Sequence, residues 1–312
     1  MINLDEIKNA ERRIAPHIRQ TPLLQVTALR VPITEANLWL KLECLQPTGS
    51  FKVRGATNRW LTTPVEKLGN GIVTASGGNH GLATARAANL AGVPATIFVP
   101  KNITPAKLVK LAAWGANVEI FGNVWDECNE QALALADATG AAYFHPFADP
   151  AVIAGQGTLG LEILQALPEL DVILVSIGGG GLISGIASVL KVLKPSVKII
   201  GIEPEGSPTL HASLQAGQVM RLPQVTTRVA TMACGKTEQL VFDIVRQSVD
   251  HVVLVSDEAL LSAAQWLWFE LGLAADLSGS AAIAALRSGQ LTFAKDVNVC
   301  ALVCGAGQEG IG

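Results

Sequence analysis

One stretch of 19 residues limits the possible folds of this chain more than any other. Residues 172–190 carry no charge and are nearly as long as the ~20 apolar residues of a membrane-spanning helix. Four consecutive glycines, Gly178 to Gly181, interrupt the stretch and disfavour one continuous helix. They divide it into a short apolar run at 172–177 and a longer apolar segment. The pattern predicts a strand, a glycine loop and a helix of a soluble α/β protein rather than a membrane span.

The rest of the chain repeats this alternation of short apolar runs and helical segments. Such a rhythm is typical of parallel sheets covered by helices on both faces. Strands are expected at 72–75, 95–99, 117–121, 142–145, 172–177, 198–202, 252–255 and 297–303. The expected fold class is therefore α/β. The 312 residues are enough for two domains, with a cleft between two sheets, and we expect no appended regulatory domain.

Composition excludes several other classes of protein. Apolar residues make up 49% of the chain and charged residues 16%, which is not the signature of a disordered protein. The net charge is −3 and no basic run is present, so nucleic acid is not an expected partner. The five cysteines form no CxxC pair, and the N-terminus lacks the apolar core of a secretory signal. We therefore expect reduced thiols and a cytoplasmic location.

The first candidate for chemistry is Lys52, in the segment Gly-Ser-Phe-Lys-Val-Arg-Gly at 49–55. A single lysine is usually a solvated surface group, and one short motif is weak evidence. The second candidate is the turn Ser-Gly-Gly-Asn-His-Gly at 76–81, between an expected strand and helix. Its free N–H groups suit a carboxylate or phosphate, although many βα turns of this kind bind nothing.

The loop at Gly178 to Gly181 is the stronger candidate for a phosphate cradle, because four residues without side chains expose more N–H groups than a turn needs. Its spacing is not that of a dinucleotide fingerprint, so a nicotinamide oxidoreductase is only a remote alternative. Cys304 directly follows the last expected strand. Its thiol either faces a ligand at the sheet edge or is a small buried apolar group.

Taken in order, these motifs resemble the fold type II pyridoxal phosphate enzymes, specifically the serine/threonine dehydratase and serine racemase family. The matching segments are GSFKVRG, SGGNHG, HPFADPAVIAGQGTLGLEIL, GGGGLISG and CGAG. The resemblance covers nearly the whole chain. It implies a tryptophan synthase β-like fold with two domains. Residues 1–64 and 150–312 would form a large domain that binds pyridoxal phosphate, and residues 65–149 a small domain that closes over the cleft.

The resemblance also assigns roles to the candidate residues. Lys52 would form the Schiff base with the cofactor and then act as base on the substrate Cα. Phe51 would pack beside the cofactor ring, Asn79 would bind its phenolic oxygen, and Cys304 would lie opposite its ring nitrogen. The remaining assignments concern two anionic groups. The phosphate would be held by Gly178, Gly179, Gly180, Gly181 and Leu182, and the substrate carboxylate by Ser76, Gly77, Gly78, Asn79 and His80.

The activity implied is an ammonia-lyase reaction that removes the β-hydroxyl of a β-hydroxy amino acid such as L-threonine or L-serine. The products would be a 2-oxo acid and ammonia, and a homodimer would be the assembly. Racemisation and β-replacement remain alternatives, because the same cofactor supports all three. A protein that binds a phosphorylated metabolite without catalysis is a remote alternative.

Four positions depart from the family pattern. Gly77 replaces the serine that serves the racemase as an acid, which favours dehydration. Glu203 and Ser207 match part of the family's cation site, but Thr209 replaces its second carboxylate, so a divalent cation is expected to bind poorly. The other two departures are Cys234, in place of an aspartate, and Asp276, in place of a glutamate. With Gly77 they suggest a pocket for a bulkier β-hydroxy amino acid.

Overall fold

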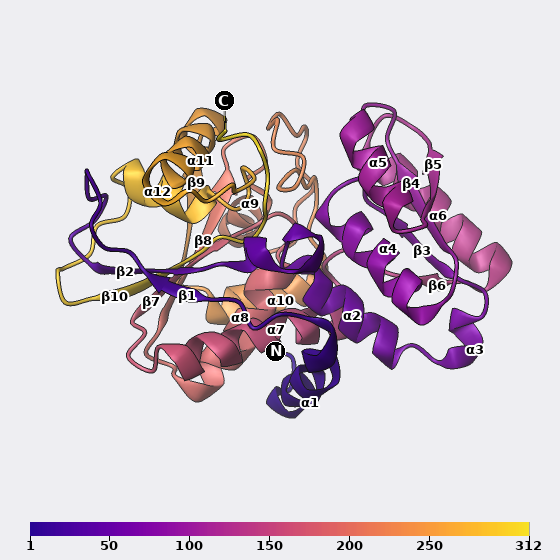
Figure 1. Ribbon diagram of the computed structural model, residues 1–312, viewed down its shortest axis with the longest axis horizontal. Helices are drawn as coiled ribbons and strands as arrows, with labels where there is room; N and C mark the ends of the chain where they lie inside the picture. The colour runs from indigo at the N-terminus through magenta and orange to yellow at the C-terminus, as the bar shows by residue number, and fades with distance from the viewer. Residues whose placement is uncertain (312) are drawn as a thin grey trace.

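The computed structural model describes residues 1–311 and contains two sheets (Figure 1). The larger sheet has six strands in the order β1-β2-β10-β7-β8-β9, all parallel except for the edge strand β1. The strands of this sheet are β1 (Leu23–Gln25), β2 (Asn37–Lys41), β7 (Val172–Ser176), β8 (Lys198–Pro204), β9 (His251–Val255) and β10 (Asn298–Leu302).

The smaller sheet has four parallel strands in the order β5-β4-β3-β6. Its strands are β3 (Ile72–Ala75), β4 (Ala95–Val99), β5 (Asn117–Ile120) and β6 (Ala142–Tyr143). All eight expected strands are therefore present, within a few residues at their ends, and the α/β class is confirmed. The expectation missed β1 and β2, which pair with each other and extend the larger sheet beyond β10.

Helices cover both sheets and connect their strands. They are α1 (Leu4–Ile14), α2 (Lys52–Thr62), α3 (Val65–Leu68), α4 (Asn79–Ala91), α5 (Pro105–Ala113), α6 (Trp125–Thr139), α7 (Pro150–Ala166), α8 (Gly181–Leu193), α9 (Thr209–Ala216), α10 (Gln239–Ser248), α11 (Asp257–Leu271) and α12 (Ala281–Arg287). Short 3₁₀ turns are η1 (Ala15–His17), η2 (Glu43–Leu45) and η3 (Pro47–Gly49). None of the helices among the described residues has the length and apolar character needed to cross a bilayer.

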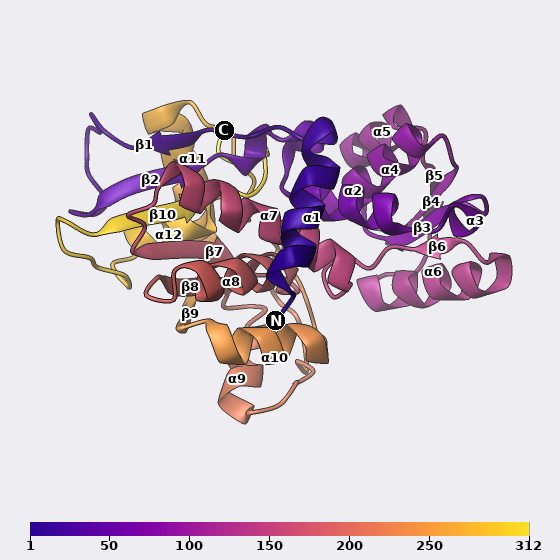
Figure 2. The ribbon, with the colours of Figure 1, turned by 90° about the horizontal axis from the view of Figure 1, so that it is seen from below.

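The six-stranded sheet is buried on both faces. Along β7, Ile173 and Val175 join an apolar cluster with α1, α7, α8 and α10, whereas Val172 and Leu174 join a second cluster with α11 and α12. Figure 2, seen from below, shows α1, α7, α8 and α10 on the near side. The strand thus reads as a continuous apolar run because successive side chains enter two different cores.

The four-stranded sheet has the same layered arrangement on a smaller scale. Its strand β3 places Ile72 in a cluster with α4 and α5, and Val73 in a cluster with α6. The turn that contains Ser76 leaves β3 at its carboxyl end, and the glycine loop leaves β7 of the other sheet in the same way. In parallel α/β folds, ligands bind beyond the carboxyl ends of strands, so both segments lie where a site is expected.

Candidate active site

The glycine loop between β7 and α8 is shaped by close packing and by one unusual backbone conformation. Gly180 has φ +93°, which a side chain would strain. A Cβ at Gly179 would lie 2.2 Å from Cδ1 of Phe147, and one at Gly181 would lie 2.4 Å from the Phe147 carbonyl oxygen. Only glycine therefore allows the loop to approach Phe147 so closely.

This loop also presents a row of free donors. In the part of the chain that the structure describes, the N–H groups from Gly178 to Leu182 have no hydrogen-bond acceptor. They precede and begin α8, where the helix dipole favours negative charge. A cradle of free N–H groups that cannot tolerate side chains fits a phosphate group.

The turn from Ser76 to His80 forms a second set of donors at the start of α4. The Gly78 N–H lies 3.4 Å from the Ser76 hydroxyl oxygen, while those of Gly77, Asn79 and His80 have no acceptor within residues 1–311. The His80 ring is buried and lies 3.1 Å, Nε2 to O, from the carbonyl of Phe144. Burial lowers the pKa of His80 to about 3. The ring is therefore neutral, and only the backbone of His80 is available to an anion.

Lys52 is the first residue of α2, directly after Phe51. Its Nζ donates a hydrogen bond to the carbonyl oxygen of Pro146 at 2.7 Å and lies 5.2 Å from the centre of the Phe51 ring. Burial lowers the pKa of Lys52 from 10.5 to about 8. An amine with such a pKa readily loses its proton near neutral pH, as a nucleophile or general base requires.

Asn79 and Cys304 both contact residues 276–278, a short segment that precedes α12. The Asn79 side chain donates from Nδ2 to Oδ2 of Asp276 at 2.9 Å. This hydrogen bond connects the start of α4 to the segment before α12. Cys304 is buried, and its sulfur lies 3.1 Å from the hydroxyl oxygen of Ser176 and 3.6 Å from that of Ser278. Burial raises the pKa of the Cys304 thiol to about 12, so the group is a neutral thiol.

The residues around Glu203 do not fit a cation site. The buried carboxylate accepts backbone N–H groups from Leu210 at 2.8 Å and His211 at 2.9 Å, at the start of α9. The hydroxyls of Ser207 and Thr209 both donate to the carbonyl oxygen of Cys234. Among the described residues, no group of three or more His, Cys, Asp or Glu side chains is placed to hold a metal. Weak cation binding stays a prediction.

The space next to Gly77 is taken by a neighbouring side chain. A Cβ at this position would lie 2.8 Å from Cδ1 of Ile103 and 3.5 Å from Cγ1 of Val99. Ile103 therefore fills the space that a side chain would occupy. The bulkier substrate expected from Gly77, Cys234 and Asp276 stays a prediction.

Sequence reasoning missed several residues at this site. It did not find the Pro146 carbonyl, the Phe147 ring or the Ser278 hydroxyl, although the first two belong to the quoted segment HPFADP. Ser278 lies two residues after Asp276 in the segment Asp-Leu-Ser. Their partners are distant in the chain, so no local pattern identifies the contacts.

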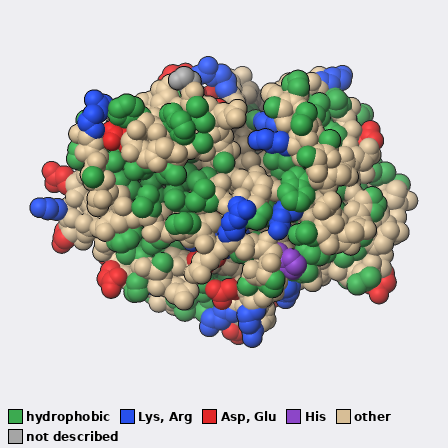
Figure 3. Space-filling model, viewed as in Figure 1, with side chains coloured by type: hydrophobic (Ala, Val, Ile, Leu, Met, Phe, Trp, Pro, Cys, Tyr) green, Lys and Arg blue, Asp and Glu red, His purple; other side chains and the backbone are tan. Residues whose placement is uncertain are grey.

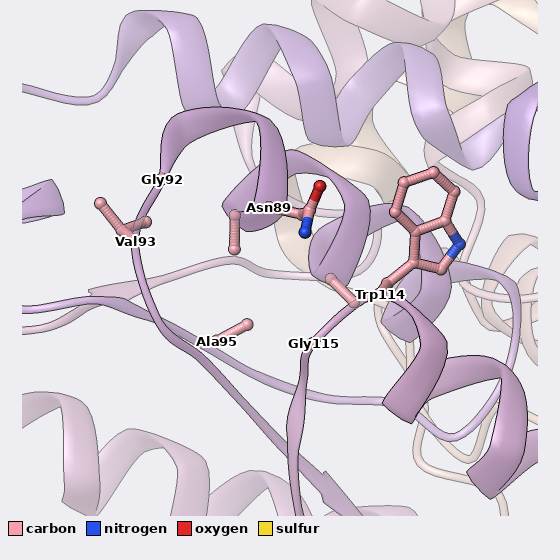
Figure 4. Close-up of a pocket in the computed structure, with 8 residues that line it drawn as sticks. Asn89, Gly92, Val93, Ala95, Trp114 and Gly115 are labelled. Carbon is pink, nitrogen blue, oxygen red and sulfur yellow. The ribbon is translucent and has the colours of Figure 1, made fainter.

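A hollow of about 180 Å³ lies elsewhere, between α4, α5 and β4 (Figure 4). Its lining includes Asn89 and Trp114 but no ionisable side chain and none of the candidate site residues. Pockets are useful guides to sites only where polar groups converge in them. We therefore locate the site by its chemistry, at Lys52 and the two glycine turns.

A lysine amine, a phosphate cradle and an anion-binding turn on parallel-sheet scaffolds are typical of enzymes that carry a phosphorylated aldehyde cofactor on a lysine. The chain belongs to the pyridoxal-phosphate dependent enzyme family, whose sequence model matches residues 14–305. Pyridoxal phosphate is accordingly its cofactor. The free N–H groups and the tight Gly179 and Gly181 contacts fit the phosphate of that cofactor.

Known proteins of two activities resemble this chain. It is 40% identical to the L-threonine ammonia-lyase of Thermotoga maritima, over 92% of this chain and 71% of that protein. It is 37% identical to the serine racemase of Oryza sativa subsp. indica, over 92% of this chain and 84% of that protein. The structure of maize serine racemase superposes with a TM-score of 0.92 at 33% identity, over 97% of this chain and 93% of that one.

Proposed function

We propose that this enzyme is an ammonia-lyase that eliminates the β-hydroxyl of a β-hydroxy amino acid such as L-threonine or L-serine, releasing a 2-oxo acid and ammonia. The observation that carries the proposal is the largely buried Lys52 amine, whose Nζ donates to the Pro146 carbonyl at 2.7 Å, next to the Phe147 that packs against the glycine loop. Similarity to an L-threonine ammonia-lyase over most of the chain supports the same reaction.

Each anionic group has a proposed set of donors. The N–H groups of Gly178 to Leu182 hold the cofactor phosphate, which also places the cofactor at the carboxyl end of β7. When bound, pyridoxal phosphate supplies an electron-withdrawing ring that stabilises negative charge at the substrate Cα. The free N–H groups of the Ser76 to His80 turn hold the substrate carboxylate.

Lys52 moves the proton in this proposal. Its Nζ takes the proton from Cα as a general base, and the ammonium group so formed gives a proton to the β-hydroxyl, which leaves as water. The Pro146 carbonyl, 2.7 Å from Nζ, orients the amine by accepting one of its hydrogens. Phe51 packs beside the ring, and Asn79 binds the phenolic oxygen. The buried Cys304 thiol, whose pKa burial raises to about 12, stays neutral opposite the ring nitrogen.

The second candidate function is racemisation of a β-hydroxy amino acid, which the similarity to serine racemases favours. A racemase needs a proton carrier on each face of Cα. At Gly77 the chain has no side chain, and Ile103 fills the adjacent space. We therefore place elimination first, racemisation second and β-replacement third.

The test is release of 2-oxo acid by the purified holoenzyme from L-serine, L-threonine, their D-forms, hydroxyaspartate and aryl-substituted β-hydroxy amino acids. We expect release from L-threonine or L-serine, and loss of at least about 10²-fold in Lys52→Ala, because a positioned base contributes that much. Lys67→Ala, at an exposed lysine, is the matched control. Loss of substrate chirality without oxo acid would instead establish racemisation. Undiminished activity in Lys52→Ala would refute the role of the amine.

Domain movement and assembly complete the proposal. We propose that residues 65–149 form a small domain that closes over the cleft, against a large domain of residues 1–64 and 150–312. An ion pair of 2.6 Å between Asp126 on α6 and Arg221, which follows α9, supports contact across that cleft.

We also propose that the enzyme is a cytoplasmic homodimer. Apolar side chains gather on the face over the six-stranded sheet (Figure 3), and Trp268 and Phe269 of α11 are exposed. The five cysteines are all free, as expected of a protein in a reducing compartment. Size-exclusion chromatography with light scattering tests the assembly, and a monomer at working concentration would refute it.

A further inference from the structure

His145 lies in the connection between β6 and α7, directly before Pro146. Its Nδ1 accepts hydrogen bonds from two backbone N–H groups of the same turn, that of Phe147 at 3.2 Å and that of Ala148 at 2.9 Å. A backbone N–H can only donate, so Nδ1 is the acceptor in both hydrogen bonds. Burial lowers the pKa of His145 to about 4, which leaves the lone pair of Nδ1 free to accept near neutral pH. The imidazole therefore closes this turn.

Phe147, the residue that this turn holds, is one wall of the phosphate cradle assigned above. Its buried ring lies so close to Gly179 that a Cβ there would overlap the ring, and its carbonyl oxygen meets Gly181 in the same way. The hydroxyl of Thr237 donates to the Gly179 carbonyl oxygen at 3.0 Å. Within residues 1–311 this is the only side-chain hydrogen bond to the loop from Gly178 to Leu182. The shape of the loop therefore depends on where Phe147 lies.

The His145 ring also packs against the Phe147 ring. The two ring centres are 4.6 Å apart at an interplanar angle of 83°, which is an edge-to-face contact. Tyr143, two residues earlier, contacts the imidazole with ring centres 6.1 Å apart at 79°. Alternate residues of the segment that leaves β6 thus form a row of three rings, and the last of them meets the glycine loop. His145 acts on Phe147 in two ways, as an acceptor for its N–H group and as a ring against its ring.

We propose that His145 is a positioning residue for the cofactor phosphate: its Nδ1 holds the turn that places Phe147 against the glycine loop. His145 acts through this turn, and no contact between its own ring and the phosphate is part of the proposal. The inference rests on the proposed function in one point, that the N–H groups of Gly178 to Leu182 hold the phosphate. His145 comes from the segment that leaves the smaller sheet, whereas the glycine loop leaves the larger one. One imidazole therefore links the smaller sheet to the phosphate site of the larger.

Binding of pyridoxal phosphate and of pyridoxal to the cofactor-free protein tests the proposal. Pyridoxal keeps the aldehyde that reacts with Lys52 but lacks the phosphate, so the ratio of the two dissociation constants isolates the contribution of the phosphate. The change in absorption on binding gives both constants. In His145→Ala we expect the affinity for pyridoxal phosphate to fall about tenfold, the effect of one hydrogen bond of ordinary strength, while the affinity for pyridoxal stays within about twofold.

Two further variants separate the acceptor from the ring. His145→Asn keeps an acceptor near the place of Nδ1, because asparagine side chains accept backbone N–H groups of the residues that follow them in turns. It should bind pyridoxal phosphate nearly as well as the unmodified protein. His145→Phe keeps a ring and removes the acceptor, so it should lose as much affinity as His145→Ala. His251→Ala, at an exposed histidine, is the matched control. Thermal unfolding checks that each variant folds.

Three results would overturn the proposal. The first is an unchanged ratio of the two dissociation constants in His145→Ala, the second is full affinity in His145→Phe, and the third is a loss in His145→Asn as large as in His145→Ala. None of these measurements involves turnover, so they separate the inference from the proposed reaction. A selective loss for pyridoxal phosphate, with no 2-oxo acid from the unmodified enzyme, would support the role of His145 and refute the ammonia-lyase reaction. Release of 2-oxo acid with an unchanged ratio would do the opposite.

Discussion

Cδ1 of Ile103 lies 2.8 Å from the position that a Cβ on Gly77 would occupy. Ile103 comes from the connection between β4 and α5, whereas Gly77 belongs to the turn after β3. The isoleucine therefore packs under the turn whose N–H groups we assign to the substrate carboxylate. Its terminal methyl group decides whether this turn accepts a side chain.

This contact predicts how a serine at position 77 behaves. Gly77→Ser is expected to lose about 1 to 3 kcal/mol in the free energy of unfolding, the usual cost of overpacking. Ile103→Val removes only Cδ1, so the double variant should recover much of that loss. Gly78→Ser in the same turn meets only Thr231 Cγ2 at 3.6 Å, and Ile103→Val should not improve it. Denaturant unfolding measures the cycle, and additive effects of Gly77→Ser and Ile103→Val would contradict it.

The buried lysine predicts a dependence of stability on pH in the cofactor-free protein. Between pH 8 and 10.5 the unfolded chain keeps the Lys52 proton and the folded protein releases it, so the free energy of unfolding rises with pH. Below about pH 8 both states are protonated, and the folded state bears the whole cost of the buried charge. Lys52→Met should remove this rise and add up to about 3 kcal/mol at pH 7.

Urea unfolding of Lys52→Met across this pH range, with Lys67→Met as the control at an exposed lysine, measures the effect. The control should keep the rise of the unmodified protein. A parallel pH profile for Lys52→Met would show that another group causes the rise.

The hydrogen bonds around Glu203 predict that neither the activity nor the stability of the enzyme depends on divalent cations. Its carboxylate already accepts the N–H groups that begin α9, and the Thr209 hydroxyl donates to a backbone carbonyl. Mg²⁺, Ca²⁺ or a chelator should therefore leave both kcat and the unfolding temperature unchanged. A cation-dependent rise in unfolding temperature would disprove this. In that case Thr209→Asp, which supplies a second carboxylate, serves as the comparison.

Substitution of the buried Arg54 is expected to cause a large loss of stability. Arg54 is fully buried, with Nε 2.7 Å from Glu43 and Nη1 2.8 Å from Glu162. Burial raises the pKa of Glu43, but Arg54 more than reverses the effect, so that the pKa is lowered. Arg54→Met leaves Glu43 buried without its cation, at a cost of about 3 to 5 kcal/mol.

The control for this prediction is Arg228→Met, because Arg228 forms an exposed ion pair with Glu258. Such pairs contribute about 0 to 1 kcal/mol. Chemical denaturation of both variants makes the comparison, and similar losses would argue against a special role for burial.

Local sequence patterns were sufficient to predict much of the architecture. The continuous apolar run of β7 predicted a strand buried on both faces, and the four glycines predicted the loop that ends it. These features depend on neighbours in the chain. Strand β1 was missed because it has only three residues and is largely exposed. Its place comes from pairing with β2, not from its own periodicity.

The candidate site likewise has one part that the sequence predicts and another that only the tertiary structure decides. The Ser76 to His80 turn and the Gly178 loop follow from local sequence, because glycines at a helix start leave N–H groups free. The role of Lys52 follows instead from the resemblance of the ordered motifs to the family. The tertiary structure alone decided that Pro146 orients Lys52, that Ile103 fills the space at Gly77, and that Asp276 joins Asn79 to Cys304. Apart from the neighbours Asp276 and Ser278, the partners in these contacts are from 26 to 197 positions apart in the chain. Packing between distant segments brings them together, and the spacing of residues along one segment carries no record of it.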